Sequence, residues 1–185
     1  MIGNHELAEM MEQTRQLRRG FAPTAPRAWD AATAGAELAV QLGHLALCVA
    51  RRHGINMSAY DDPGRPINDI GDELADVTLA TLSIGVLADE SPTSIRSSHS
   101  AASVIEALLM LLVCAGQAAE AGLISAGYRH QPTGSPPPVP DACATTLQTA
   151  DRLAELLGLD LPEQFQAMYA DANRFLRSHQ SGDQT

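Results

Sequence analysis

The sequence contains no lysine, and all twelve of its basic residues are arginines. A chain without lysine cannot carry a Walker-A phosphate loop, a Schiff-base lysine or a pyridoxal phosphate site. The arginines are outnumbered by 22 acidic residues, which gives a formal net charge of −10, and they form no dense basic run. Nucleic-acid binding through an electrostatic surface is therefore not expected.

Cysteine and long apolar runs are also scarce. The three cysteines, Cys48, Cys114 and Cys143, are far apart, lie in apolar stretches and lack Cys-x-x-Cys spacing, which is typical of reduced, buried side chains. The N-terminus has acidic residues where a signal peptide would be basic, and the longest apolar run, residues 107–115, is too short to span a bilayer. A cytoplasmic protein without a membrane segment is expected.

Alanine and leucine dominate the rest of the chain, whereas aromatic residues make up only 4%. Residues of high strand propensity are sparse except where valine and isoleucine occur in helical spacing. A length of 185 residues suits one domain that buries a core without disulfides or metal ions. We therefore expect a single all-α domain over residues 1–185, built as a bundle of five to six helices.

Helical spacing and helix-ending residues predict where these helices lie. The first helix is followed by a linker that reaches residue 28. Asp30 and Asp69 are expected to be the N-caps of the second and third helices. A proline-rich connector covers residues 131–140. The fourth helix is apolar around most of its circumference, so we expect it at the centre of the core or at a subunit interface. The expected helices are 4–19, 30–53, 71–88, 98–127, 143–158 and 162–178.

Two segments of the sequence suggest a faint internal duplication. The run VQLGHLA at residues 40–46 is similar to VCAGQAA at residues 113–119, and Gly54 and Gly127 fall at the same later position. Such a match can arise by chance in a chain rich in alanine and leucine. If it is a true repeat, the second copy has no acids at the matching positions, apart from the nearby Glu120.

The polar residues with the most defined spacing lie on the second and third expected helices. Glu37, Gln41 and His44 share one stripe, and Glu73 and Asp76 share another, with further acids at positions 69 and 72. If the two helices pair antiparallel, the stripes meet and form a pocket of oxygen ligands with one imidazole. Magnesium or manganese binds such oxygen-rich sites, and the ion would neutralise a triphosphate.

Each of these residues also has a simpler interpretation. The acids from residue 69 to residue 76 are equally typical of a solvated first helical turn that interacts with the helix dipole. His44, among leucines, fits a hydrogen-bonded core histidine as well as a metal ligand. Gln41 is a poor metal ligand and a better hydrogen-bond partner.

Trp29, ELAVQLGHLA at residues 37–46, GDELADVTLATL at 71–82 and the run at 153–175 together resemble the MazG-type all-α nucleotide pyrophosphohydrolases. The resemblance covers most of the chain apart from residues 88–140. It implies a MazG-like bundle in which Glu-Glu-x-x-Glu on one helix and Glu-x-x-Asp on the next hold magnesium. The reaction that it implies is hydrolysis of a nucleoside triphosphate to the monophosphate and pyrophosphate, with Glu73 and Asp76 as the second motif.

The first motif of the family departs from its pattern here, because Val40, Gln41 and His44 stand where the glutamates are expected. Glu37, one turn earlier, is the only acid left. The resemblance therefore implies an altered magnesium or manganese site, with Glu73 and Asp76 as the catalytic carboxylates. The expected metal ligands are Glu37, His44, Glu73 and Asp76, and the expected substrate contacts are Gln41, Asn173 and Arg177.

Three functions remain open at this point. The first is a magnesium-dependent nucleoside triphosphate pyrophosphohydrolase with an altered metal site. The second is a catalytically inactive MazG-like module that binds a nucleotide or a protein, and the third is a structural protein assembled through its fourth helix. The family is usually oligomeric, so a homo-oligomer is expected as well.

Overall fold

The computed structural model describes residues 2–64, 66–93, 101–128 and 134–182, and this part of the chain contains six α-helices and no strand. The all-α prediction is therefore confirmed. Two single-turn 3-10 helices, Ala22–Thr24 and Ser58–Tyr60, lie in the connections. The helices are α1 (Asn4–Phe21), α2 (Ala31–Arg52), α3 (Ile70–Leu87), α4 (Val104–Ser125), α5 (Val139–Leu157) and α6 (Leu161–Gly182).

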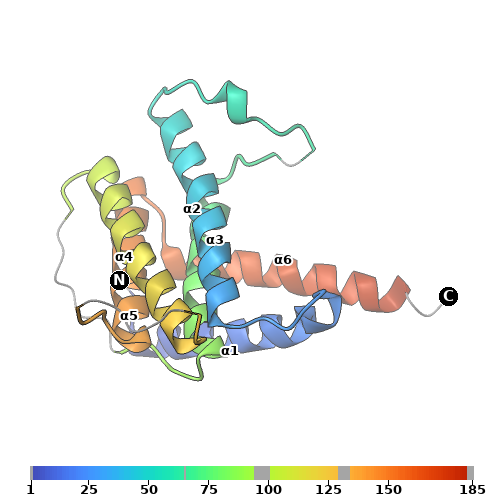
Figure 1. The fold of residues 1–185 in the computed structure, drawn as a ribbon. Helices are drawn as coiled ribbons and strands as arrows, with labels where there is room; N and C mark the ends of the chain where they lie inside the picture. Colours follow the sequence, from blue (N-terminus) through green and yellow to red (C-terminus); the bar gives the residue numbers. More distant parts are fainter. Residues whose placement is uncertain (1, 65, 94–100, 129–133, 183–185) are drawn as a thin grey trace.

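Four of the helices form an antiparallel bundle, and the other two cover one side of it (Figure 1). α2 packs against α3 and α4, and α5 completes the bundle by packing against the same two helices. α1 and α6 both lie against α3. α1 and α6 run parallel to each other, because Gln13 contacts Gln166 and, further along both helices, Phe21 stacks on Phe175.

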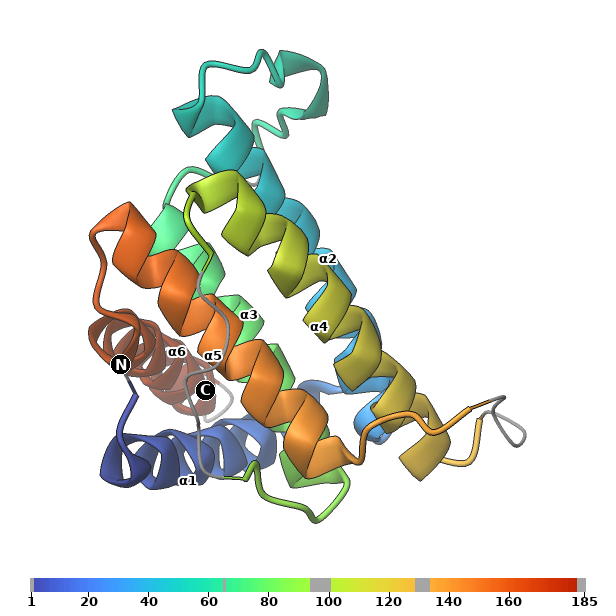
Figure 2. The same ribbon diagram turned by 90° about the vertical axis from the view of Figure 1, so that its left-hand side faces the viewer.

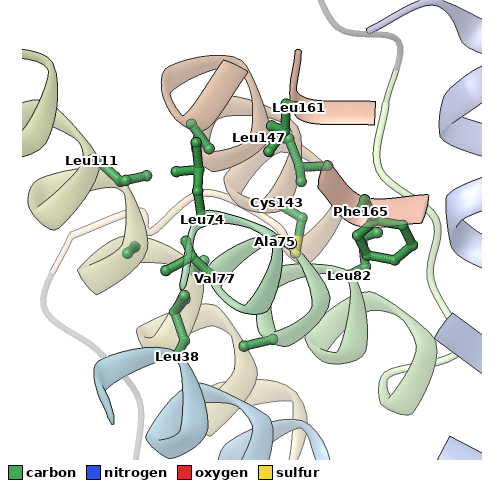
Figure 3. Packing of buried hydrophobic residues seen from close by; sticks show 14 of the residues in the cluster. Leu38, Leu74, Ala75, Val77, Leu82, Leu111, Cys143, Leu147, Leu161 and Phe165 are labelled. Atoms are coloured by element: carbon green, nitrogen blue, oxygen red, sulfur yellow. The ribbon is translucent and has the colours of Figure 1, made fainter. Parts of the chain in front are cut away.

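The central helix of the bundle is α3 rather than α4. The expectation that the fourth helix lies at the centre of the core is therefore wrong. α3 packs against all five other helices, and its side chains are buried around most of the circumference. Figure 3 shows Leu74 and Val77 of α3 between Leu38 of α2 and Leu111 of α4. α4 lies at the edge of the bundle, and Figure 2 shows no helix in front of it.

The predicted helix ends are confirmed where a capping side chain or a glycine sets them. The Asp30 carboxylate accepts a hydrogen bond of 2.8 Å from the Thr33 amide, and Asp69 accepts one of the same length from the Gly71 amide. Gly158 ends α5 with φ at 76°, in the left-handed region that glycine adopts without strain. These boundaries depend on neighbouring residues, so the sequence alone predicts them well.

Several helix boundaries differ from the prediction, among them the end of α6, which lies at Gly182 rather than at residue 178. α1 continues through Gly20, where a Cβ atom would lie 2.6 Å from a methyl carbon of Leu176, so this glycine permits close packing with α6 instead of ending the helix. α4 begins after its N-cap Ser103, and residues 98–100 of the predicted helix lie outside the described residues. α5 begins at Val139, within the predicted connector.

α2 and α4 approach each other closely and run in opposite directions. A Cβ atom at Gly122 would lie 2.7 Å from the carbonyl oxygen of Ala31, and one at Gly35 would lie 3.2 Å from the Cα atom of Ala119. Residue numbers therefore rise along one helix as they fall along the other. The two small residues allow the backbones to meet, as is usual where helices pack at short distance.

A Gly122→Ala variant is expected to be less stable than the wild-type chain by about 1–3 kcal/mol, because the added methyl group overlaps a backbone oxygen that cannot turn aside. Urea denaturation followed by circular dichroism measures the change. The matched control is Gly43→Ala on α2, where the space around the Cβ position is open, and where we expect a gain of up to about 1 kcal/mol from helix propensity. Equal effects at the two positions would contradict the close contact.

α2 and α4 have a further property in common. Each contains 22 residues, and by length and composition each would be able to cross a membrane, a property shared with the core helices of bundles. The uninterrupted apolar run at residues 107–115 is too short to span a bilayer, whereas the whole helices also contain small neutral residues that add to their apolar length. No membrane helix follows from this property alone.

The bounds of α2 and α4 are related by a constant offset. α4 begins at residue 104, which is 73 positions after residue 31, and ends at residue 125, which is 73 positions after residue 52. Gly54 and Gly127, also 73 positions apart, have φ values of 75° and 74°. The helices that follow, α3 and α5, pack in corresponding places, each against the helix before it.

Candidate functional site

A seam of polar side chains runs between α2 and α3. On α2 it contains the stripe Glu37, Gln41, His44, Cys48 and Arg51. The stripe meets α3 and the loop before it in reverse order, because His44 lies beside Glu73, whereas Cys48 and Arg51 lie beside the carbonyl of Ile67. The antiparallel pairing expected from the sequence is therefore present, and it brings the two polar stripes together.

His44 and Glu73 form the centre of this seam. The His44 Nδ1 atom lies 3.3 Å from Glu73 Oε2 and 3.0 Å from Gln41 Oε1. Both neighbours are hydrogen-bond acceptors, so we assign the proton of the ring to Nδ1. Glu73 is only 8% exposed. A carboxylate in such surroundings needs a hydrogen-bond donor or a positive charge nearby, and His44 supplies the positive charge when it is protonated.

Glu37 is held by a different partner, Arg18 of α1. Both terminal nitrogens of the guanidinium donate to the two carboxylate oxygens, and Arg18 Nε donates to Ser83 Oγ at 2.7 Å. The guanidinium carbon also lies 4.8 Å from the ring centre of Trp29. Such a two-point pair fixes the geometry of Glu37 and neutralises its charge.

The remaining acids lie at the beginning of α3. Asp69 is the N-cap of this helix, as predicted. Partial desolvation by the neighbouring helices raises the pKa of Asp72, although its side chain still reaches water, and the negative charges of Asp69 and Asp171 raise it further. Asp76 is partly buried one turn after Glu73. The interpretation as a solvated acidic turn therefore describes Asp72, which is exposed, but not the buried Glu73.

Cys48 extends the seam toward the loop before α3. Its thiol donates to the Ile67 carbonyl at 3.7 Å. Burial, followed by the charge of Glu73, raises the pKa of this thiol, so it stays protonated at neutral pH. Arg51 donates to the same carbonyl and to Asp61, which ties the loop to the end of α2. Neither side chain is arranged as a metal ligand.

The expected substrate contacts are spread over two helices. Gln41 lies within the seam, against His44. Asn173 and Arg177 lie in the second half of α6, on either side of Phe175, which stacks on Phe21 of α1. The Asn173 amide donates to the Tyr169 carbonyl at 2.9 Å within the same helix, and Arg177 is exposed. The structure therefore places one of the three expected contacts, Gln41, in the seam.

The fit of the seam to a divalent ion can be tested on its donor set. In the described part of the chain, no group of three or more histidine, cysteine, aspartate or glutamate side chains is placed to hold a metal ion. Of the four expected ligands, Glu37 is turned to Arg18 and His44 to Glu73. Magnesium requires about six oxygen ligands in octahedral arrangement, and these residues as placed do not fit it.

Sequence reasoning did not identify Arg18, Ser83 or the contact of Trp29 with Arg18. Arg18 is 19 positions before Glu37 and on another helix, and no spacing rule connects them.

A comparison of the chain with protein families and with curated proteins, and of its fold with solved structures, found no match.

Proposed function

We propose that the chain is a MazG-like helical bundle that has replaced a magnesium site by internal ion pairs and acts as a non-catalytic binding module. One observation carries this proposal. Glu37 and Glu73, two of the carboxylates expected to bind the ion, each lie against a side chain that is cationic or becomes so on protonation, Arg18 and His44. An incoming ion would have to separate both pairs before it gained a ligand.

A protein partner is favoured over a nucleotide by the charge of the chain. A triphosphate carries several negative charges, whereas this chain has a net charge of −10 and no lysine. The Arg18 guanidinium is already committed to Glu37 and Ser83. The two residues expected to meet phosphate on α6, Asn173 and Arg177, lie in its second half and outside the seam. The seam therefore offers little to hold phosphate groups.

We propose further that the bundle contains two hairpins related by duplication, α2–α3 and α4–α5. The offset of 73 residues between α2 and α4 and their antiparallel packing support this proposal, whereas α5 begins 69 positions after α3 begins and ends 70 positions after α3 ends. The second hairpin has uncharged residues wherever the seam has charged ones. Met110, Gln117, Thr146 and Thr149 stand 73 positions after Glu37, His44, Glu73 and Asp76, respectively. Only the first hairpin thus carries ionisable groups at these places.

A second candidate function is a nucleoside triphosphate pyrophosphohydrolase that uses an altered magnesium or manganese site. The burial of Glu73 favours it, because a buried carboxylate destabilises a core by several kcal/mol unless it is compensated. A residue with that effect is often kept for chemistry rather than for stability. Glu73 and Asp76 would be the carboxylates that this candidate requires.

Pyrophosphate release separates the two candidates. The purified chain is incubated with a panel of ribonucleoside and deoxynucleoside triphosphates in the presence of magnesium or manganese, beside a Glu73→Gln variant. We expect no release above the protein-free blank and no rise in melting temperature with any ion or nucleotide. Release that is lost in Glu73→Gln would contradict the non-catalytic proposal and support the second candidate.

A further inference from the structure

We propose that the outward surface of α4, with the adjoining strip of α2, is the surface through which two copies of this chain associate. This α4 face consists of Ile105, Leu109, Leu112, Val113 and Gly116 of α4, and Val40 and Gly43 of α2. Leu109 and Val113 are 58% and 64% exposed, although they are large aliphatic side chains. The inference is independent of the chemistry proposed for the seam.

The exposed side chains lie at helical spacing, so they form one continuous stripe. Positions 105, 109, 112, 113 and 116 follow one another at intervals of one turn or less along the outside of α4. The inward stripe of the same helix, which includes Leu111 and Ala115, fills the core of the bundle. α4 is therefore apolar on two sides, and the described part of this chain covers only one of them.

The exposed side chains of the α4 face lie between two grooves. A groove of about 690 Å³ lies on the α5 side of the stripe and is lined by Leu109, Val113 and Thr145, among others. A second groove, of about 370 Å³, lies on the α2 side and is lined by Gly43, Gly116 and neighbouring residues. A ridge bordered by grooves matches a copy of itself across a twofold axis, because each ridge enters a groove of the other copy.

The difference between the two hairpins explains why the α5-side groove is open. At the corresponding place in the first hairpin, Arg18 lies between Trp29 and Glu37. The residues 73 positions after Trp29 and Glu37 are Ala102 and Met110. The second hairpin therefore lacks both the ring that contacts the arginine and the carboxylate that holds it. The walls of this groove are mainly aliphatic, with the polar side chains of Glu106 and Gln117 among them, so most of its surface favours an apolar occupant.

Charge also favours a second copy of the chain. None of the seven residues of the α4 face is charged, in a molecule with a net charge of −10. Two like-charged molecules meet with least repulsion through such a neutral surface. Glu106 lies near the N-terminal end of α4, and a twofold axis near the middle of the helix keeps the two copies of this carboxylate far apart.

The outward surface of α4 sets a lower bound on the area of the face. A helix of 22 residues is about 33 Å long and about 10 Å across, so α4 presents roughly 330 Å² before its corrugation, the strip of α2 and the walls of the two grooves are added. Standard interfaces bury about 800 Å² per partner. The second copy fills a face that includes both grooves, whereas a small ligand would cover only one groove.

The test is the molar mass in solution and its response to Gly116→Arg. One chain has a mass of 19.6 kDa, and sedimentation equilibrium of the wild-type protein is expected to give twice this value. The space around a Cβ atom at Gly116 is open, and arginine has a higher helix propensity than glycine, so the variant keeps its fold. Its side chain projects into the partner, and we expect association to weaken by about 100-fold.

The matched control is Ala170→Arg, which places the same side chain on an exposed position of α6 and is expected to leave the dimer intact. A second variant, Leu109→Glu, tests the same face with the opposite charge. Circular dichroism verifies that each variant is folded. A monomeric wild-type chain, or Gly116→Arg and Leu109→Glu variants that dimerise like the wild type, would overturn the proposal. So would a monomer that binds phosphatidylcholine vesicles through this face.

Discussion

A His44→Leu variant is expected to have a free energy of unfolding about 3–5 kcal/mol below that of the wild-type chain. The substitution removes the ring nitrogen that lies 3.3 Å from Glu73 Oε2, while the carboxylate stays in its buried position. A buried charge that loses its partner is among the most destabilising changes in a core. Urea denaturation at neutral pH measures the loss.

Replacing both members of the pair is expected to restore the stability. In His44→Leu/Glu73→Met neither charge nor donor remains, and two apolar side chains of similar volume fill the seam, so the free energy of unfolding should equal the wild-type value or exceed it by about 1–4 kcal/mol. His5→Leu on the exposed face of α1 is the control, with an expected change below about 0.5 kcal/mol. A double variant as unstable as the single one would contradict the assigned pair.

Phe165→Ala is the second substitution with a large expected effect, a loss of about 3–5 kcal/mol. Phe165 has no exposed surface and lies in the core near Leu82 and Cys143, where it holds α6 against the bundle (Figure 3). Its removal leaves a cavity between elements that are distant in sequence. Urea denaturation again gives the free energy, and limited proteolysis tests whether α6 separates first.

Phe175→Ala provides the matched comparison. This ring is also on α6 and stacks on Phe21 with their centres 6.1 Å apart, but it is 50% exposed. Water already reaches half of the side chain, so truncation is expected to lower the stability by only about 1 kcal/mol. Equal losses for the two variants would show that burial at position 165 is not what fixes α6 on α3.

Local chemistry explains which parts of the fold the sequence predicts. The beginnings of α2 and α3 follow from Asp30 and Asp69, whose carboxylates bond to amides two or three residues later. The place of α4 does not follow from composition. An apolar helix surface has the same sequence whether its partner is another helix of the chain or lies outside it, and only the assembled bundle identifies α3 as the middle helix.

In the seam, too, local features follow from the sequence and contacts between distant helices do not. The spacing of Glu37, Gln41 and His44 predicts one stripe, and the antiparallel pairing of α2 with α3 places that stripe opposite Glu73. The partner of Glu37 could not be predicted, because Arg18 reaches it from α1 through the packing of α1 on α3. A stripe can be read from one helix, whereas a salt bridge between helices depends on how all of them are packed.

The parallel course of α1 and α6 has an electrostatic consequence. In the antiparallel bundle of α2 to α5 the helix dipoles largely cancel, but those of α1 and α6 add. Their carbonyl ends lie at the same side of the molecule (Figure 1), and Arg19 lies in the last turn of α1. The two partial negative charges at this side of the molecule therefore lie next to each other, and an arginine there interacts with both helix ends rather than with one.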